Sequence, residues 1–237
     1  VVVAPEEATR SAFEKRIREH RECLKRARRR CHEPAQTRNG TRVLVMANVG
    51  CREDTERAAG LGADGIGLYR LEGLFLSSRS LPSEAELIGQ IRETLEPMAG
   101  RPITLRLLDA GGDKAIPWLD LPHESNPFLG RRGIRLLLDF PELLSVQMRA
   151  FLQLSEELDV RILVPMVTLA EEMEKVRDLA LDLAAERGLR TIPPIGAMIE
   201  TPGNPDFGAR TLGAASRARY AREVRGFSAW SPRTRRR

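Results

Sequence analysis

Long apolar runs are missing from this sequence of 237 residues, because no stretch approaches the roughly 18–20 apolar residues that a membrane-spanning helix needs. The first residues, VVVAPEE, also lack the basic start and the apolar core of a secretory signal peptide. Since the chain begins with Val1 rather than methionine, we expect it to be a fragment or a trimmed product. These features predict a cytoplasmic location and no membrane partner.

Cysteine and histidine are scarce as well. The three cysteines, Cys23, Cys31 and Cys51, are an odd number without the close spacing of a metal site. Neither a disulfide framework nor a zinc centre is therefore predicted, and a reducing cytoplasm is the simplest setting. None of the three histidines has a neighbouring group that indicates catalysis, so we assign no catalytic residue to this chain.

Aromatic residues make up only 5% of the chain, and its net charge of +5 is unevenly distributed. Residues 1–38 hold 11 Lys/Arg and 6 Asp/Glu, residues 39–209 hold 18 and 26, and residues 210–237 hold 9 and 1. The basic charge thus lies at the two ends, around an acidic middle. A nucleic-acid-binding domain combines a basic folded face with interleaved aromatics, so we expect no nucleic-acid partner.

Apolar periodicity predicts an α/β fold. Helical spacing is expected at 6–31, 54–60, 83–99, 131–139, 141–157 and 169–187, and short apolar strands at 42–49, 65–69, 102–108, 160–167 and 194–200. Strands that alternate with helices form right-handed βαβ units and a parallel sheet, here with about five βα steps. The periodicity stops after Pro202, and residues 203–237 read as a basic, disordered tail.

Three of the predicted strands end on a charged side chain, namely Arg70, Arg106 and Glu200. In parallel α/β sheets, ligands bind beyond the carboxyl ends of the strands. Guanidinium groups pair with phosphate and carboxylate oxygens, and a carboxylate there suits Mg²⁺. An anionic ligand held together with a metal ion is one interpretation, and structural salt bridges at the rim are the other.

Two loops carry further candidates. Gly111 and Gly112 let the backbone after the third strand approach a ligand, although an ordinary turn also accounts for them. The segment at 126–135, NPFLGRRGIR, places arginines at a loop-to-helix junction, where free N–H donors favour anions. For Arg131 and Arg135 a solvated helix face is the favoured interpretation.

Taken together, these stretches resemble Enzyme I of the sugar phosphotransferase system, the phosphoenolpyruvate–protein phosphotransferases. The matching segments are VMANVG at 45–50, GADGIGLYR at 62–70, LLDAGGDK at 107–114, NPFLGRR at 126–132, VPM at 164–166 and MIETP at 198–202. Pyruvate phosphate dikinase and phosphoenolpyruvate synthase share the strand-end arginine. Six motifs in the same order are far more specific than any one alone.

The resemblance implies a (β/α)₈ TIM barrel that binds phosphoenolpyruvate and Mg²⁺. By motif match, Arg70, Arg106 and Arg132 contact phosphoenolpyruvate, and Glu200 is one Mg²⁺ ligand. In the family the phosphoryl group moves to a histidine on a separate N-terminal domain and then to a carrier protein, and the intact enzyme is a homodimer. The sequence leaves open whether the pathway serves sugar transport or nitrogen regulation. The implied domains are a linker helix at 1–38 and a partial barrel at 39–202, followed by the divergent tail.

The sequence also departs from the family. Leu71 stands where threonine is usual, and the phosphohistidine domain, the sixth-strand Gly-Thr-Asn-Asp motif and the later catalytic cysteine are absent from this chain. A frameshift or a truncated reading frame is our hypothesis for the tail. We expect no phosphotransfer by this chain alone, and either marginal stability or association with a second chain, because a partial barrel leaves open sheet edges.

Two alternative functions follow from these departures. The chain is either a non-catalytic, phosphoenolpyruvate-binding or regulatory fragment, or a piece of a dikinase- or synthase-type enzyme whose nucleotide-binding domain lies elsewhere. Mg²⁺-dependent binding without turnover favours the first alternative.

Overall fold

The computed structural model of this chain describes residues 3–112, 116–119, 121, 124–127 and 129–201. The tail at 203–237, for which the sequence predicts disorder, lies outside these residues. In the described part no helix combines the length and the apolar character that crossing a membrane requires.

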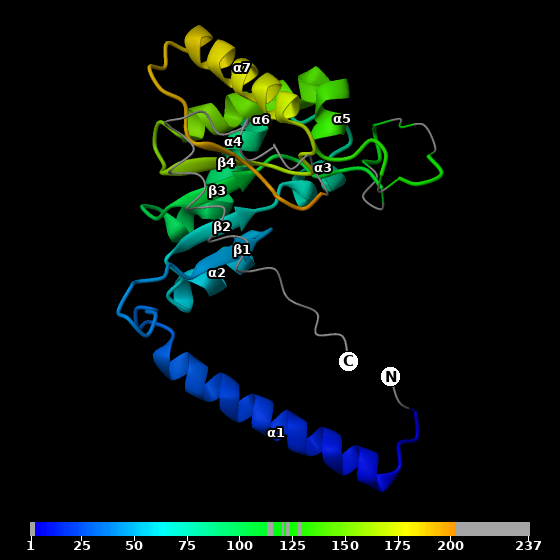
Figure 1. Ribbon diagram of the computed structural model, residues 1–237, viewed down its shortest axis with the longest axis vertical. Helices are drawn as coiled ribbons and strands as arrows, with labels where there is room; N and C mark the ends of the chain where they lie inside the picture. The colour runs from blue at the N-terminus through cyan, green and yellow to red at the C-terminus, as the bar shows by residue number, and fades with distance from the viewer. Residues whose placement is uncertain (1–2, 113–115, 120, 122–123, 128, 202–237) are drawn as a thin grey trace.

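Five parallel strands form one sheet, and their order in the sheet follows their order in the chain. They are β1 (Met46–Val49), β2 (Gly65–Tyr69), β3 (Ile103–Arg106), β4 (Val160–Val164) and β5 (Ile195–Ala197). A doubly wound sheet reverses its strand order at a switch point, whereas the strands of a (β/α) barrel follow one another. The α/β class is confirmed, and the arrangement is consistent with a partial TIM barrel (Figure 1).

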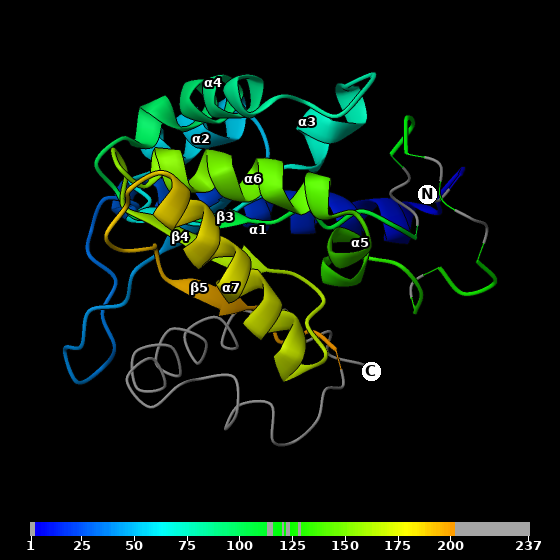
Figure 2. The same cartoon turned by 90° about the horizontal axis from the view of Figure 1, so that it is seen from above.

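Helices connect successive strands and pack next to one another. The crossovers contain α2 (Arg52–Gly60), α4 (Glu84–Leu95) with a 3-10 turn η1 (Glu96–Met98), α6 (Pro141–Leu154) and α7 (Ala170–Glu186). α4 contacts both α2 and α6, and α6 contacts α7 (Figure 2). The helices thus follow the strand order, and together with the strands they form one apolar cluster that includes Ile66, Leu87, Ile91, Ile103, Leu105, Met148 and Phe151.

Local sequence explains where the helices of this layer begin. Ser83 accepts a hydrogen bond from the Glu86 N–H, and the Glu86 carboxylate accepts one from the Ser83 N–H, which is a complete capping box for α4. Glu172 caps the start of α7 in a similar way, because its carboxylate accepts hydrogen bonds from the N–H groups of Thr168 and Leu169. Pro141 begins α6, where its missing N–H costs nothing.

The N-terminal helix α1 (Glu7–Arg30) confirms the prediction for residues 6–31. None of its residues is buried, and it extends away from the sheet and its helices (Figure 1). Phe13, Ile17 and Leu24 are each about half exposed on it. The division of the chain into domains at residues 38 and 202 stays a prediction.

The structure corrects several predicted boundaries. The strand expected at 42–49 begins only at Met46, because Arg42 pairs with Gln36 in an isolated antiparallel bridge and the Val43 N–H donates to Ala35. The helix expected at 131–139 is α5 (Ile134–Asp139), since Gly133 has a positive φ of 54° that no helix accommodates. One short helix, α3 (Glu72–Ser77), was not predicted.

β2 has its predicted bounds, whereas β3, β4 and β5 end earlier than expected. β4 ends at Val164 rather than at residue 167, because Met166 takes a left-handed φ of 58°. β5 covers Ile195–Ala197, although the Met198 N–H still donates to the Val164 carbonyl. These early ends leave polar loop residues at the carboxyl edge of the sheet.

Candidate anion-binding site

Arg106, the last residue of β3, is a buried charged group at the carboxyl edge of the sheet, with 6% of its surface exposed. One of its terminal nitrogens forms an ion pair with Glu72, the first residue of α3. The other, Nη1, lies 3.6 Å from Oδ2 of Asp109. Its Nε is buried and has no hydrogen-bond partner among the described residues. A buried donor without a partner is costly, and here it indicates a place for a ligand acceptor.

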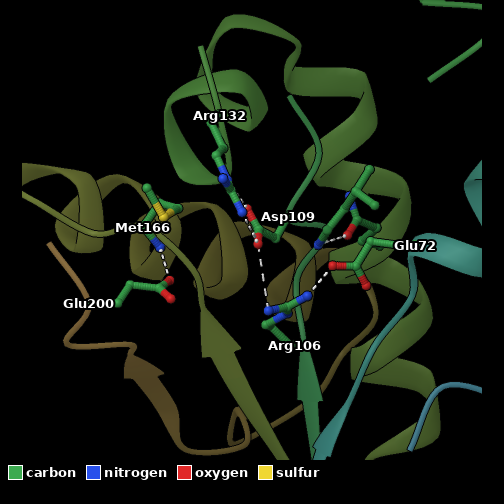
Figure 3. Close-up of polar contacts among 8 residues, drawn as sticks. Glu72, Arg106, Asp109, Arg132, Met166 and Glu200 are labelled. Carbon is green, nitrogen blue, oxygen red and sulfur yellow. Dashed lines mark hydrogen bonds and ion pairs between the residues drawn. The ribbon is translucent and has the colours of Figure 1, made fainter. Parts of the chain in front are cut away.

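Asp109 connects Arg106 to a second arginine, Arg132. Arg132 donates from Nε to Oδ1 of Asp109 at 3.0 Å and from Nη2 to Oδ2 at 3.2 Å, which is a bidentate pair. The Asp109 side chain is only 4% exposed and lies between the two guanidinium groups (Figure 3). Glu72, Arg106, Asp109 and Arg132 therefore form a line of alternating charges.

A closed loop base brings Arg132 to this line, although Arg132 is 26 positions beyond Arg106 in the sequence. The Gly133 N–H donates to the Ala110 carbonyl at 3.1 Å. Gly111 has a φ of 110°, and a Cβ placed on it would lie 2.3 Å from the Arg131 carbonyl oxygen. Only glycine permits this backbone and this approach, so Gly111 allows the two ends of the loop to meet.

Gln147, on helix α6, fixes the start of the same loop. It is completely buried. Its Oε1 accepts from the Leu108 N–H at 2.8 Å, and its Nε2 donates to the Leu143 carbonyl at 2.6 Å. The backbone next to Asp109 is thus held by a side chain whose own amide is satisfied on both sides.

Arg70 follows β2 and differs from the other two arginines. It is exposed, and its guanidinium lies over Gly50, since a Cβ placed on that glycine would be 3.6 Å from Nη2 of Arg70. Its backbone N–H donates to Val49 at 3.0 Å, but its side chain has no ion pair with the described residues. Arg70 is therefore the cation at this edge that no protein carboxylate neutralises in the described part of the chain.

Glu200 lies beyond β5 and is held by the loop after β4. Its Oε1 accepts from the Met166 N–H at 2.8 Å, and Met166 is the residue with the left-handed backbone (Figure 3). The next residue, Thr201, donates to the Val167 carbonyl at 2.6 Å. One carboxylate oxygen of Glu200 is thus occupied, while Oε2 has no hydrogen bond to a described residue.

A metal ion has limited protein ligands here. No group of three or more His, Cys, Asp or Glu residues that could hold a metal is found among the described residues. Mg²⁺ often takes only one or two protein carboxylates and completes its octahedron with ligand phosphates and water. Glu200 fits such a ligand, but a cage made of protein groups alone is not present in the described part.

Comparison with known proteins agrees with this geometry. A family model described as "PEP-utilising enzyme, PEP-binding domain" matches residues 25–205. The chain belongs to this family. The match covers all five strands of the sheet and every described residue of the charged line.

Named relatives of this PEP-binding domain are phosphotransferases. A phosphoenolpyruvate-protein phosphotransferase of Priestia megaterium is 35% identical over 209 residues, which are 86% of this chain and 36% of the relative. A multiphosphoryl transfer protein of Rhodobacter capsulatus is 40% identical over 205 residues, with coverages of 85% and 24%. The phosphoenolpyruvate-protein phosphotransferase of Haemophilus influenzae is 41% identical over 174 residues, with coverages of 71% and 30%. The chain thus spans 24–36% of the length of these three relatives, and the resemblance to Enzyme I is confirmed.

Within this PEP-binding domain the four predicted site residues share one edge of the sheet but not one set of contacts. Arg106 and Arg132 meet at Asp109, whereas Arg70 and Glu200 have separate neighbours. The alternative interpretation, a structural salt bridge at the rim, is partly correct, because Arg106 forms ion pairs with protein carboxylates. These pairs are buried, however, and they leave the Nε of Arg106 without a hydrogen-bond partner among the described residues.

The other loop arginines do not join this site. Arg131 pairs with Asp139 at 3.2 Å, with both side chains about half exposed, and Arg135 donates to the Leu129 carbonyl at 2.6 Å. Sequence reasoning missed Glu72, Asp109 and Gln147 as site residues. The signal for Asp109 was its place three residues after a strand-end arginine, at the start of the Gly-Gly turn.

Proposed function

We propose that this chain binds phosphoenolpyruvate through Arg70, Arg106 and Arg132, as the substrate-binding part of a longer phosphoenolpyruvate–protein phosphotransferase. The observation that carries the proposal is the pair of arginines on one buried carboxylate, together with the buried Nε of Arg106, which has no hydrogen-bond partner among the described residues. The names and the coverage of the relatives support the larger assignment.

The chemistry of the ligand suits these residues. Phosphoenolpyruvate carries a phosphoryl group and a carboxylate, and guanidinium groups bind both in forked geometry. Arg106 and Arg132 are already oriented and largely shielded from water, so little reorganisation accompanies binding. Exposed Arg70 can close over the ligand from the β2 side. Phosphoryl transfer depends above all on such positioning and charge neutralisation.

Glu200 completes the proposal as the protein ligand of Mg²⁺. When bound, the ion would neutralise charge on the phosphoryl oxygens. The role of this chain is to keep the Glu200 carboxylate oriented through the Met166 N–H, with the second oxygen directed away from that bond.

The remaining parts of the proposal lie outside this chain. The phosphoryl acceptor is a histidine on an N-terminal domain, from which a carrier protein receives the group in sugar transport. Cytoplasmic location and homodimer formation also stay predictions that rest on the family.

Calorimetric titration of the 237-residue chain with phosphoenolpyruvate tests the proposal, with and without Mg²⁺. We expect saturable binding that Mg²⁺ strengthens and that Arg106→Ala and Arg132→Ala each weaken about tenfold or more, as for loss of a charge-assisted bond. Arg92→Ala is the matched control, because Arg92 forms an exposed pair with Glu157 on the helix layer. No binding by the wild-type chain, or equal losses in all three variants, would contradict the proposal.

The regulatory alternative makes a different prediction for the same sample. A non-catalytic binding module would bind phosphoenolpyruvate in a Mg²⁺-dependent way and would never transfer the phosphoryl group. Phosphohistidine formation after addition of the purified N-terminal domain of a relative would rule out the regulatory alternative, because a non-catalytic module cannot transfer the phosphoryl group.

A further inference from the structure

The geometry points to Asp109 as a positioning residue: we infer that it sets the separation and orientation of Arg106 and Arg132, so that both guanidinium groups meet one phosphoryl group. This inference rests on the proposed function. Asp109 itself touches the ligand-binding side chains rather than the ligand.

The first argument is the sharing of a single atom. Oδ2 of Asp109 is 3.2 Å from Nη2 of Arg132 and 3.6 Å from Nη1 of Arg106. Oδ1 accepts in addition from Nε of Arg132 at 3.0 Å. The bidentate contact fixes the plane of the Arg132 guanidinium, and the shared oxygen fixes its distance from Arg106 (Figure 3).

The second argument is charge. Two guanidinium cations that are 7% and 14% exposed repel each other strongly where the effective dielectric constant is low. The Asp109 carboxylate contacts both of them. Removal of the Asp109 charge would therefore let Arg132 move away from Arg106.

The third argument is that Asp109 is held independently of the arginines. The Leu108 N–H donates to buried Gln147, and the Ala110 carbonyl accepts from Gly133. Both neighbours of Asp109 are thus anchored by groups that carry no charge. The Asp109 carboxylate therefore stays in place as a common partner for the two guanidinium groups.

Three possible roles of Asp109 differ in the sign of one measurement. A positioning residue predicts weaker binding of phosphoenolpyruvate by Asp109→Asn. A carboxylate that merely repels the incoming anion predicts tighter binding. A residue that only stabilises the fold predicts a lower Tm with unchanged affinity.

The test uses Asp109→Asn, Asp109→Glu and wild type as full chains, titrated with phosphoenolpyruvate and Mg²⁺ and followed by ¹H–¹⁵N spectra of the arginine Nε–H groups. Arg106→Lys and Arg132→Lys assign the two signals. Asp64→Asn is the matched control: it makes the same chemical change in a carboxylate that pairs with Arg42, just before β2 at the opposite edge of the sheet.

We expect Asp109→Asn to weaken binding about tenfold or more, the size expected for a charge-assisted contact, and to shift the Nε–H signals of both arginines without ligand. Asp109→Glu should recover part of the affinity, and Asp64→Asn should change affinity less than twofold. Tighter or unchanged binding in Asp109→Asn, or an unmoved Arg132 signal, would overturn the inference. If the wild-type chain does not bind phosphoenolpyruvate, the proposed function fails, and the ligand-free spectra still decide whether Asp109 orients the arginines.

Discussion

Glu72 and Arg106 form an ion pair between two successive βα units, and their side chains are only 11% and 7% exposed. Glu72 opens α3, which sequence patterning did not predict, and Arg106 closes β3. The pair therefore connects the loop after one strand to the end of the next. It also orients Arg106 through the terminal nitrogen that Asp109 does not contact (Figure 3).

Replacing Glu72 by Gln should destabilise the fold. A buried arginine that loses one of its carboxylates keeps its desolvation cost, and breaking such a pair typically costs about 3 kcal/mol. Urea unfolding of the chain measures this loss. Glu157→Gln is the control, because its pair with Arg92 is about half exposed and should be worth less than about 1 kcal/mol. Equal losses in the two variants would contradict a special role of the buried pair.

Gly111→Ala should open the loop base that carries Arg132. The new Cβ would lie 2.3 Å from the Arg131 carbonyl oxygen, at a φ of 110°, so the backbone must shift. We expect a lower Tm together with weaker binding of phosphoenolpyruvate. Gly188→Ala is matched to it, because Gly188 also has a positive φ but nothing within 4 Å.

The control substitution should cost only the left-handed backbone penalty of about 1–2 kcal/mol and leave affinity unchanged. Normal affinity in Gly111→Ala would show that Arg132 does not depend on the loop base.

Glu200→Gln should remove the effect of Mg²⁺ on phosphoenolpyruvate binding while leaving the metal-free affinity within about twofold. The amide oxygen can still accept from the Met166 N–H, but it is a much weaker Mg²⁺ ligand than a carboxylate. Titrations at several Mg²⁺ concentrations test this. Glu174→Gln, on the exposed face of α7, should behave like wild type. A full Mg²⁺ effect in Glu200→Gln would assign the ion to other residues.

Acid sensitivity should decrease in Asp64→Asn. The pKa of Asp64 is lowered from its ordinary value, chiefly because the Val45 N–H donates to the carboxylate, with a further contribution from Arg42. The unfolded chain then binds the proton more readily than the native chain. The stabilisation is fully present above the unfolded pKa of about 3.9 and is lost as pH falls through the lower native pKa.

Unfolding free energies between pH 7 and pH 3 measure this effect. The advantage of wild type over Asp64→Asn should be greatest near neutral pH and should shrink below pH 4. A constant difference over the whole range would show that the carboxylate charge is irrelevant to stability.

The sequence predicted the five strands and most of the helices, because near-continuous apolar runs and a clear cap such as Ser83 are local signals. It did not predict α3, which has only six residues, or the early end of β4 at Val164, just before the left-handed Met166. Both depend on tertiary contacts, namely the Glu72–Arg106 pair and the Met166–Glu200 bond.

For the site, the strand-end positions of Arg70, Arg106 and Glu200 correctly placed these side chains at one edge of the sheet, and their role in binding stays a prediction. The pairing of Arg106 with Arg132 could not be read in advance, because it depends on a loop whose ends meet only where Gly111 approaches Arg131. Asp109 and Gln147 could not be predicted as site residues either, because their hydrogen-bond partners come from other elements of the fold.

The most direct test of the account follows the Nε–H signal of Arg106 while phosphoenolpyruvate and Mg²⁺ are added to the chain. This donor is buried and has no partner among the described residues, so a bound anion should accept its hydrogen bond. The account predicts a downfield shift that saturates with the same Kd as the calorimetric titration and that is lost in Arg106→Lys. A signal that stays unchanged while phosphoenolpyruvate binds would place the ligand elsewhere and contradict the central claim.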